Sequence, residues 1–388
     1  MLGRLFKPLK NKSFFLFGAR GTGKSTFLQS YFAASDILYL DLLDSRLLDE
    51  FRLDKDRFKR IVTQPEHRDK IVVVDEVQKL PEILNTVHQL IFSDKRIFVL
   101  TGSSARRLKQ LETNLLAGRA LVYHLYPFTS AELSDQFDLQ KALEFGLLPE
   151  VYLADSSELA AEILRAYIVT YVEKEIQLEQ WVRKIEPFRV FLSIAAQMNG
   201  KIVNRSAIAR EVGVDDMTIA SYYEILEDTL LGIHLPAYHH SVRKSQRTAP
   251  KFYLIDIGMK RALDRSLTIP LVQRTSAYGD AFEHFIVLEL YKIASYARND
   301  WKFSYYQTKE GHEIDLIVDR PGKKLLLVEI KSKNRVTAED AKVIERLAPE
   351  IDPDAERYLL SRDSETQILG ETRAVHWKTG LKELFDYR

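Results

Sequence analysis

Short apolar runs alternate with helical patterns over the first 150 residues of the chain. Ser13–Phe17, Lys70–Val74 and Arg96–Leu100 are rich in β-branched and aromatic residues. Such runs are typical of strands that are buried on both faces of a parallel sheet. After the first run, apolar residues recur at helical spacing in Thr26–Phe32. The alternation predicts an α/β sheet with crossover helices that ends near Pro149.

The pattern changes character after this sheet. Between residues 156 and 198, apolar positions recur at helical spacing, which predicts a helical connector. Ser206–Val214 and Asp215–Leu226 then predict two helices joined by a turn. The runs Leu231–Leu235 and Phe252–Ile255 predict two strands with a basic loop between them. Two helices followed by such a pair of strands predict a winged helix-turn-helix.

A third unit begins after Asp280. Phe282–Leu290 has the pattern of an amphipathic helix. Three strands are predicted after it, at Phe303–Tyr306, Glu313–Val318 and Lys324–Lys331. We therefore expect three domains, at residues 1–150, 151–274 and 275–388. In the first of them, Ser130 is the expected N-cap of a short helix.

Composition narrows the class of protein. The 388 residues contain 56 Lys and Arg against 55 Asp and Glu, so the net charge of +1 favours no class of partner. The chain has no cysteine, which excludes disulfide scaffolds and thiolate metal sites. It has no run of eighteen apolar residues, and Pro8 interrupts the amino-terminal segment before a signal-peptide core. We expect a cytoplasmic protein without a membrane partner.

The segment Gly18–Ser25 matches the phosphate-loop pattern G-x-x-x-x-G-K-[ST] at every fixed position. A predicted strand precedes it and a predicted helix follows it, which is the context that the motif needs. Glycines let successive N–H groups point at phosphate oxygens beside the positive end of the helix. Lys24 is expected at the β- and γ-phosphates, and Ser25 on Mg²⁺. The expected nucleotide contacts are Gly18, Ala19, Arg20, Gly21, Thr22, Gly23, Lys24, Ser25 and Thr26.

Residues for hydrolysis follow the next predicted strands. Asp75 ends a buried strand and is expected to hold Mg²⁺, while Glu76 is expected to polarise the attacking water. Ser103 is the first choice for a sensor of the γ-phosphate, with Thr101 second, although both types are also common in plain turns. Arg119 is suited to stabilise the transferring phosphoryl group, from its own chain or across a subunit boundary.

Two further sets of polar residues are candidates for nucleic-acid chemistry. Strand spacing places Glu329 and Lys331 on one face, beside the strand that carries Asp315, with Glu283 on the preceding helix. Carboxylates and a lysine in this arrangement can hold Mg²⁺ and stabilise charge on a phosphodiester, and their order predicts a nuclease-type fold. Charges on a solvent face of the sheet are the alternative interpretation of these residues. The basic loop offers candidate DNA contacts at Arg243, Lys244, Arg247 and Lys251.

Together these motifs resemble a large family of bacterial and archaeal AAA-type ATPases. In the nucleotide half, the matching segments are Gly18–Ser25, Val74–Glu76, Leu100–Ser104 and Leu116–Arg119. In the C-terminal half, they are Phe252–Gly258, Phe282–Glu283, Glu313–Asp315 and Val328–Lys331. Many members have two glycines before a Leu-Pro-Glu segment, whereas this chain has only Gly146 at that place.

The resemblance implies a fold for each domain. It implies an N-terminal P-loop NTPase of the AAA type, a three-layer α/β sandwich, then a helical connector and a winged helix. The last domain would have a PD-(D/E)xK, restriction-endonuclease-like α/β core. It also implies ATP and Mg²⁺ as cofactors and a homo-oligomer as the working form.

Three functions fit these observations. The first is an ATPase whose nucleotide state controls a DNA-facing C-terminal half. The second is a Mg²⁺-dependent nuclease that ATP gates. The third is a regulator that binds ATP, and DNA or protein, while its nuclease-like core is inert.

Overall fold

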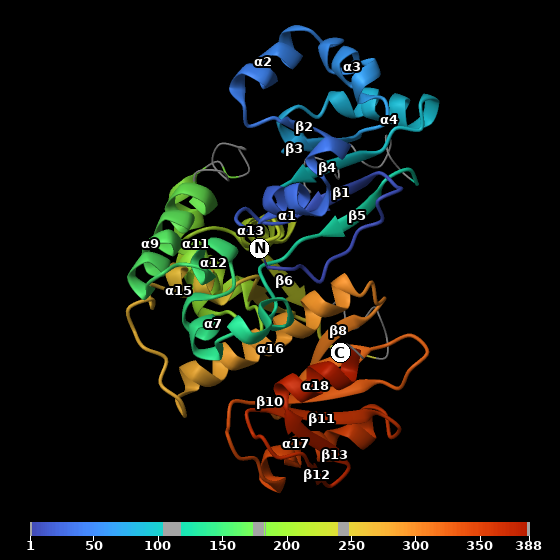
Figure 1. Ribbon diagram of the computed structural model, residues 1–388. Coiled ribbons are helices and arrows are strands. Elements are labelled where there is room, and N and C mark those ends of the chain that lie inside the picture. Colours follow the sequence, from blue (N-terminus) through green and yellow to red (C-terminus); the bar gives the residue numbers. More distant parts are fainter. Residues whose placement is uncertain (1, 104–117, 174–181, 183, 240–247, 386–388) are drawn as a thin grey trace. The chain divides into compact units, whose positions relative to one another are not determined.

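The computed structural model describes residues 2–103, 118–173, 182, 184–239 and 248–385 (Figure 1). It divides into two compact units. One, which we name the P-loop unit, contains Phe6–Phe128 and Ile225–Leu231. The other, the C-terminal unit, contains Met1–Leu5, Thr129–Glu224 and Gly232–Arg388. The expected division into three domains stays a prediction.

A five-stranded parallel sheet forms the centre of the P-loop unit, with strand order β2-β3-β4-β1-β5. Its strands are β1 (Phe14–Phe17), β2 (Ile37–Asp41), β3 (Ile71–Asp75), β4 (Phe98–Gly102) and β5 (Leu121–His124). Its helices are α1 (Lys24–Tyr31), η1 (Ala34–Asp36), α2 (Ser45–Leu53), α3 (Arg57–Val62), η2 (Pro65–His67), η3 (Val77–Lys79) and α4 (Ile83–Ser93). The predicted α/β sheet is thus confirmed, and β2 is a strand that the sequence pattern did not predict.

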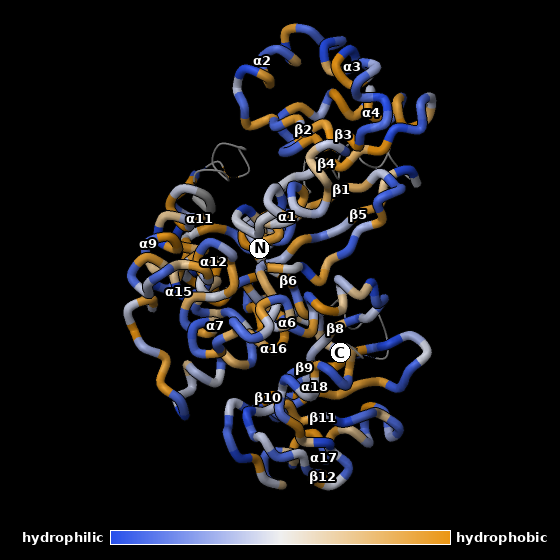
Figure 2. Tube along the Cα trace, in the orientation of Figure 1, coloured by the Kyte–Doolittle hydropathy of each residue, from blue (hydrophilic) through white to orange (hydrophobic). Residues whose placement is uncertain are grey.

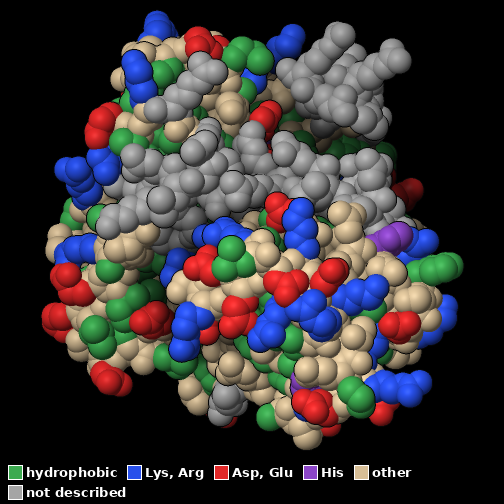
Figure 3. Space-filling model, turned by 90° about the horizontal axis from the view of Figure 1, so that it is seen from above, with side chains coloured by type: hydrophobic (Ala, Val, Ile, Leu, Met, Phe, Trp, Pro, Cys, Tyr) green, Lys and Arg blue, Asp and Glu red, His purple; other side chains and the backbone are tan. Residues whose placement is uncertain are grey.

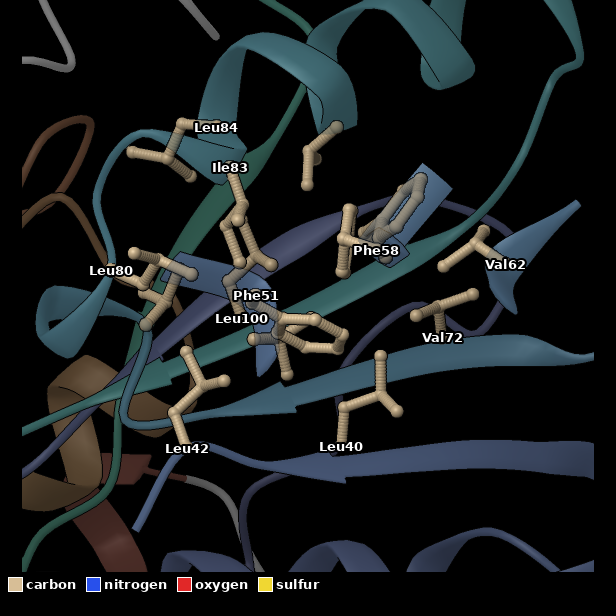
Figure 4. Packing of buried hydrophobic residues seen from close by; sticks show 14 of the residues in the cluster. Leu40, Leu42, Phe51, Phe58, Val62, Val72, Leu80, Ile83, Leu84 and Leu100 are labelled. Carbon is tan, nitrogen blue, oxygen red and sulfur yellow. The ribbon is translucent and has the colours of Figure 1, made fainter. Parts of the chain in front are cut away.

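The sheet is buried on both faces because alternate strand residues point to opposite sides. Val72 and Val74 of β3 join a core cluster with residues of α2, α3 and α4, whereas Val73 lies between them in sequence and outside that cluster. All three are fully buried. Figure 4 shows the cluster, with Phe51 of α2 and Phe58 of α3 above the strands. The strand of β3 is coloured as hydrophobic in Figure 2. This core fixes the strand ends, and therefore the loops that follow them.

The first half of the C-terminal unit is helical. Its helices are α6 (Ser130–Leu133), η4 (Ser134–Gln136), α7 (Leu139–Phe145), α8 (Pro149–Tyr152), α9 (Ser157–Tyr167), the π-helix η5 (Ile168–Glu173), α11 (Ile185–Gln197), α12 (Arg205–Val212), α13 (Asp216–Asp228) and α15 (Ile257–Leu263). An antiparallel pair, β6 (Gly232–Leu235) and β7 (Lys251–Leu254), follows α13. The two predicted helices and two predicted strands are present. Their identity as a winged helix stays a prediction.

The N-cap predicted for α6 is corrected by one residue. Thr129, not Ser130, is the N-cap, and it forms a capping box with Glu132. The hydroxyl and backbone N–H of Ser130 instead both donate to the Glu289 carboxylate, at 2.6 and 2.8 Å. A buried carboxylate needs such donors, since it has lost its water. Ser130 therefore binds a carboxylate of the distant helix α16 and does not cap α6.

The buried turn between α7 and α8 is hydrogen-bonded to the start of α15 in the same unit. Asp256 caps α15 through Met259 N at 3.1 Å and accepts Leu147 N at 2.6 Å. Gly146 has a φ of 77°, and a Cβ there would lie 2.1 Å from Asp256 Oδ1. Only glycine fits this position, because any side chain would collide with the carboxylate. The single glycine that the sequence shows here is thus the one that the turn requires.

A six-stranded mixed sheet completes the C-terminal unit, in the order β12-β13-β11-β10-β9-β8. Its strands are β8 (Lys302–Gln307), β9 (Glu313–Asp319), β10 (Leu326–Lys331), β11 (Glu356–Ser361), β12 (Gln367–Leu369) and β13 (Thr372–His376). Its helices are α16 (Ser276–Tyr296), α17 (Ala338–Ile351) and α18 (Trp377–Phe385). The predicted helix and three strands of this region are confirmed, and their nuclease-like identity stays a prediction.

Charge is mixed on the surface. The described side chains on the face drawn in Figure 3 intersperse Lys and Arg with Asp and Glu. Among the described residues, no helix combines the length and apolarity that a bilayer crossing requires.

His284 of α16 gives the C-terminal unit a predictable response to acid. Its ring is buried, Nε2 donates to Leu254 O at 2.6 Å, and Nδ1 accepts from the Asn199 amide at 3.2 Å. Burial lowers the pKa of His284 from 6.5 to about 3. Below pH 6.5 the unfolded state therefore binds a proton that the folded state does not, and stability must fall as pH falls.

We predict a loss approaching ~1.4 kcal/mol for each pH unit between about 6 and 4 from this histidine. Urea unfolding of the full chain at several pH values measures the slope. His284→Gln should flatten it, whereas His312→Gln, on an exposed turn, should leave it unchanged. Equal slopes in wild type and His284→Gln would contradict the assignment.

Candidate nucleotide site and acidic cluster

The phosphate loop runs from the end of β1 to the start of α1. Gly23 is the N-cap of α1 with a φ of 85°, and no side chain caps the helix. The first turn of α1 contains no acidic residue. At Gly18, a Cβ would lie 2.4 Å from Leu125 O, so glycine is required for the loop to pass this close to the chain. An uncapped helix start beside a tight glycine loop is a ready site for an anion.

The Lys24 ammonium lies across this loop. Its Nζ donates to Gly18 O at 2.7 Å and to Ala19 O at 3.4 Å, and the side chain is buried. Thr22 holds the same turn, since its hydroxyl donates to Ala19 O at 2.8 Å. The loop thus presents a buried positive charge at its centre, where a phosphate would lie.

The Asp75 carboxylate accepts hydrogen bonds from hydroxyl groups on three elements. Ser25 of α1 donates to Oδ2 at 2.6 Å, Tyr39 of β2 donates to the same oxygen, and Thr101 of β4 donates to Oδ1. Burial, together with the Asp75 carboxylate, raises the pKa of Tyr39, so its hydroxyl stays a donor. The structure therefore brings together Ser25 and Asp75, the two predicted Mg²⁺ residues. Carboxylate and hydroxyl oxygens are ligands that suit this ion.

Glu76 sits in a strained conformation beside Asp75. Its φ of 58° is in the left-handed region, which costs a non-glycine residue about 1–2 kcal/mol. Its Oε2 accepts hydrogen bonds from Gln78 Nε2 and from Ser103 Oγ, the latter at 3.2 Å. Gln78 Nε2 also lies 3.0 Å from Ser103 Oγ. Backbone strain of this kind is concentrated at functional sites. The predicted base and the predicted sensor are thus in direct contact.

The remaining predicted residues of this half are exposed or lie outside the described residues. Arg119 is exposed, and its guanidinium lies 5.6 Å from the centre of the Phe92 ring. Residues Ser104, Leu116 and Ala117 lie outside the described part of the chain. Arg20 is exposed and Thr26 lies in the first turn of α1.

The second set of predicted residues converges in the C-terminal unit. The antiparallel register that pairs Val328 with Leu316 brings Asp315 of β9 next to Glu329 of β10. Asp315 Oδ2 accepts Ile330 N at 2.7 Å, and Lys331 forms an ion pair with Glu329. Burial, followed by the neighbouring carboxylates, raises the pKa of Asp315 well above its usual range.

The other members come from α16, β7 and β9. Ligand oxygens of Glu283, Glu313 and Asp315 lie within 4.8 Å of one another, an arrangement that can hold a metal ion. Lys251 Nζ is ion-paired with Glu313 and lies 3.5 Å from Glu283 Oε1. Tyr253 donates to Glu283 Oε1 at 2.7 Å. We name Glu283, Glu313, Asp315, Glu329, Lys331 and Lys251 the acidic cluster.

Of the four candidate DNA contacts, only Lys251 lies within the described residues. Arg243, Lys244 and Arg247 lie outside the described residues. Lys251 is buried, with its ammonium on carboxylates, so it is grouped here with the acidic cluster and not with an exposed basic loop.

Sequence reasoning missed four polar residues of these sites. They are Tyr39, Gln78, Tyr253 and Glu313 as a ligand. Glu313 had a signal, since it stands two positions before Asp315 and thus on the same side of a strand. Gln78 follows Glu76 by two residues, but no strand or helix period links them across the turn.

The chain matches three protein-family models in succession. Residues 10–134 match an AAA domain, residues 136–269 a domain of unknown function (DUF8612), and residues 278–379 another (DUF4143). The chain therefore carries an AAA-type P-loop ATPase domain followed by a DUF4143 domain.

Its curated relatives are uncharacterized proteins. Proteins of Mycobacterium bovis and Mycobacterium tuberculosis are each 27% identical over 261 residues, 65% of this chain and 57% of the relative. The chain thus spans little more than half the length of these relatives. A protein of Methanocaldococcus jannaschii is 23% identical over 349 residues, 83% of this chain and 75% of the relative.

A solved structure covers part of the chain. Domain III of the Thermotoga maritima replication initiation protein DnaA is 17% identical and covers 42% of this chain and 78% of its own, with a TM-score of 0.22. Nothing about activity follows from that likeness.

We predict that Lys24→Ala lowers the affinity for ATP by about 10- to 150-fold, because one charge-assisted hydrogen bond contributes about 1.5–3 kcal/mol. Fluorescent-nucleotide titration measures the change. Lys12→Ala, at an exposed position of the same unit, is the matched control and should bind as wild type does. Wild-type affinity in Lys24→Ala would exclude this lysine from the phosphates.

Proposed function

We propose that the AAA domain binds MgATP in the phosphate loop and hydrolyses it. Lys24 would bind the β- and γ-phosphates, while Ser25 and Asp75 would hold Mg²⁺. Glu76 would polarise the attacking water as a general base. The observation that carries the proposal is the convergence of Ser25, Tyr39 and Thr101 on Asp75 beside the uncapped start of α1.

Gln78 and Ser103 would set the position of the Glu76 carboxylate. Both contact Glu76 Oε2, and they also contact each other. A water-activating carboxylate must point at its water to act, so the residues that hold it affect the chemical step more than binding. Ser103 lies directly after β4 and would respond to the γ-phosphate as a sensor.

The nucleotide state would control a DNA-facing C-terminal half, with a winged helix formed by α12, α13, β6 and β7. Covalent continuity supports such coupling. The helix α13 begins in the C-terminal unit, whereas Ile225–Leu231 belong to the P-loop unit, where Leu230 packs against the core. A change at the strand ends of that core can therefore be transmitted along one helix. Salt-dependent binding of duplex DNA with and without ATP would test this part.

A second candidate function is Mg²⁺-dependent chemistry on a phosphodiester in a nuclease-like core. The predicted site is Glu283, Asp315, Glu329 and Lys331. Its specific support is that ligand oxygens of Glu283, Glu313 and Asp315 lie within 4.8 Å of one another. In addition, Glu329 is buried, and its Oε2 has no hydrogen-bond partner among the described residues. A regulator with an inert core is the remaining alternative. Nicking of plasmid DNA with Mg²⁺ distinguishes the two.

We predict that Glu76→Gln retains ATP affinity and lowers turnover by about 10²–10⁴-fold, as expected for loss of a general base. Gln78→Leu should also retain affinity and should lower turnover by a smaller factor, because the carboxylate remains but is no longer held. Coupled ATPase assays and nucleotide titration separate the two effects. Glu82→Gln serves as the control, because Glu82 also follows β3 in the sequence but its carboxylate is exposed. Wild-type turnover in Glu76→Gln would remove Glu76 from the mechanism.

Assembly generates a separate prediction. If the exposed Arg119 completes the site of a neighbouring copy in a homo-oligomer, specific ATPase activity rises with protein concentration, and Arg119→Ala abolishes that rise. Arg119→Lys keeps the charge but not the planar fork, so it should restore activity only in part. Full activity of a dilute monomer, measured with light scattering on the same sample, would contradict the model.

A further inference from the structure

The strand β7 sends two side chains into the acidic cluster. Lys251 and Tyr253 are two residues apart, and side chains at this spacing leave a strand on the same side. The Lys251 ammonium is ion-paired with Glu313 and lies 3.5 Å from Glu283 Oε1. Tyr253 donates to that same Glu283 oxygen at 2.7 Å. One strand therefore supplies the cluster with both a positive charge and a hydroxyl donor.

The Lys251 side chain is only 4% exposed, so its ammonium is removed from water. Besides the two carboxylates, it lies 5.5 Å from the centre of the Tyr305 ring, whose face attracts cations. Burial alone would lower the pKa of Lys251, but Glu283 and Glu313 outweigh burial and raise it. The lysine is thus a fixed cation in an oxygen-lined site.

The cluster still contains more negative than positive groups. Four carboxylates, Glu283, Glu313, Asp315 and Glu329, face the two ammonium groups of Lys251 and Lys331. Burial is the first cause that raises the pKa values of Asp315 and Glu329, and neighbouring carboxylates add to it.

A second observation, at Glu329, is independent of these ion pairs. Glu329 is 3% exposed, and its Oε2 has no hydrogen-bond partner among the described residues. Its other oxygen is ion-paired with Lys331. A buried, unpartnered carboxylate oxygen costs free energy unless a proton or a cation takes it.

We propose that the Lys251 ammonium occupies the place of a divalent cation in the acidic cluster and thereby keeps the cluster from binding Mg²⁺ or Mn²⁺ tightly. The inference rests on the second candidate function, in which these carboxylates take such an ion. Mg²⁺ needs direct oxygen ligands in near-octahedral geometry. Because Lys251 already contacts oxygens of Glu283 and Glu313, the ion and the ammonium compete for them. A displacement of β7 would remove Lys251 and the Tyr253 hydroxyl together.

The test is Mn²⁺ titration by calorimetry on the full chain without nucleotide. An Asp75→Asn background removes the metal carboxylate of the phosphate loop from the signal. In this background, the Lys251→Met variant should bind one Mn²⁺ at least tenfold more tightly than the chain that keeps Lys251. Adding Asp315→Asn should abolish the gain. Lys342→Met, which removes an exposed lysine of α17, controls for net charge and should show no gain.

Thermal unfolding provides a second test if the Lys251→Met variant folds poorly. The melting temperature is measured in a chelator and in Mn²⁺. A divalent ion that replaces the ammonium should raise the melting temperature of Lys251→Met and of Lys251→Gln more than that of the parent. If Mn²⁺ stabilises neither variant, Lys251 has a purely structural role and the inference is wrong.

The role of Lys251 and the metal site itself can be tested separately. If the parent chain binds Mn²⁺ at the cluster as tightly as Lys251→Met, only the role of Lys251 is wrong. If neither chain binds Mn²⁺ there, the metal site of the second candidate function is wrong, and the inference falls with it.

Discussion

The Asp75 carboxylate is the point on which the nucleotide site depends. It ends the β3 strand, which lies between β2 and β4 in the sheet, and Ser25, Tyr39 and Thr101 reach it from α1, β2 and β4. In a parallel sheet the carboxyl ends of all strands lie at one edge, so a single carboxylate can join three elements there. The buried core below fixes that edge. The start of α1 after the phosphate loop, Tyr39 of β2 and the end of β4 are therefore tied to one group whose burial demands donors.

The sequence predicts those residues of the nucleotide site that lie close together along the chain. The phosphate loop can be recognised because its glycines and Lys24 belong to one strand–turn–helix segment. The role of Tyr39 could not be predicted, since β2 is a half-buried edge strand. The contact of Tyr39 with Asp75 depends on the register that pairs Leu40 with Val74. Gln78 was missed because the left-handed turn at Glu76 redirects the chain, and neither strand nor helix periodicity extends across it.

The acidic cluster shows the same division in the C-terminal unit. Period-two spacing placed Glu329 and Lys331 together, and the structure pairs them. Lys251 looked like part of a basic loop, because charge along the sequence carries no information on burial. Its carboxylate partners are 32 and 62 residues away, and only the packing of β7 against α16 and β9 brings them together. The cap at Thr129 was misassigned for a related reason, since Glu289 competes for the Ser130 hydroxyl.

The two sites meet one electrostatic constraint in different ways. At Asp75 the buried carboxylate is satisfied by hydroxyl groups, which are neutral, so an added Mg²⁺ would bring the first positive charge into direct contact with it. In the acidic cluster, lysines already supply positive charge to Glu283, Glu313 and Glu329. A cation entering the first site meets dipoles that can rotate, whereas one entering the second must displace an ammonium. Under the two proposals, a metal ion is therefore favoured at the nucleotide site and opposed at the cluster, although both are lined with carboxylate oxygens.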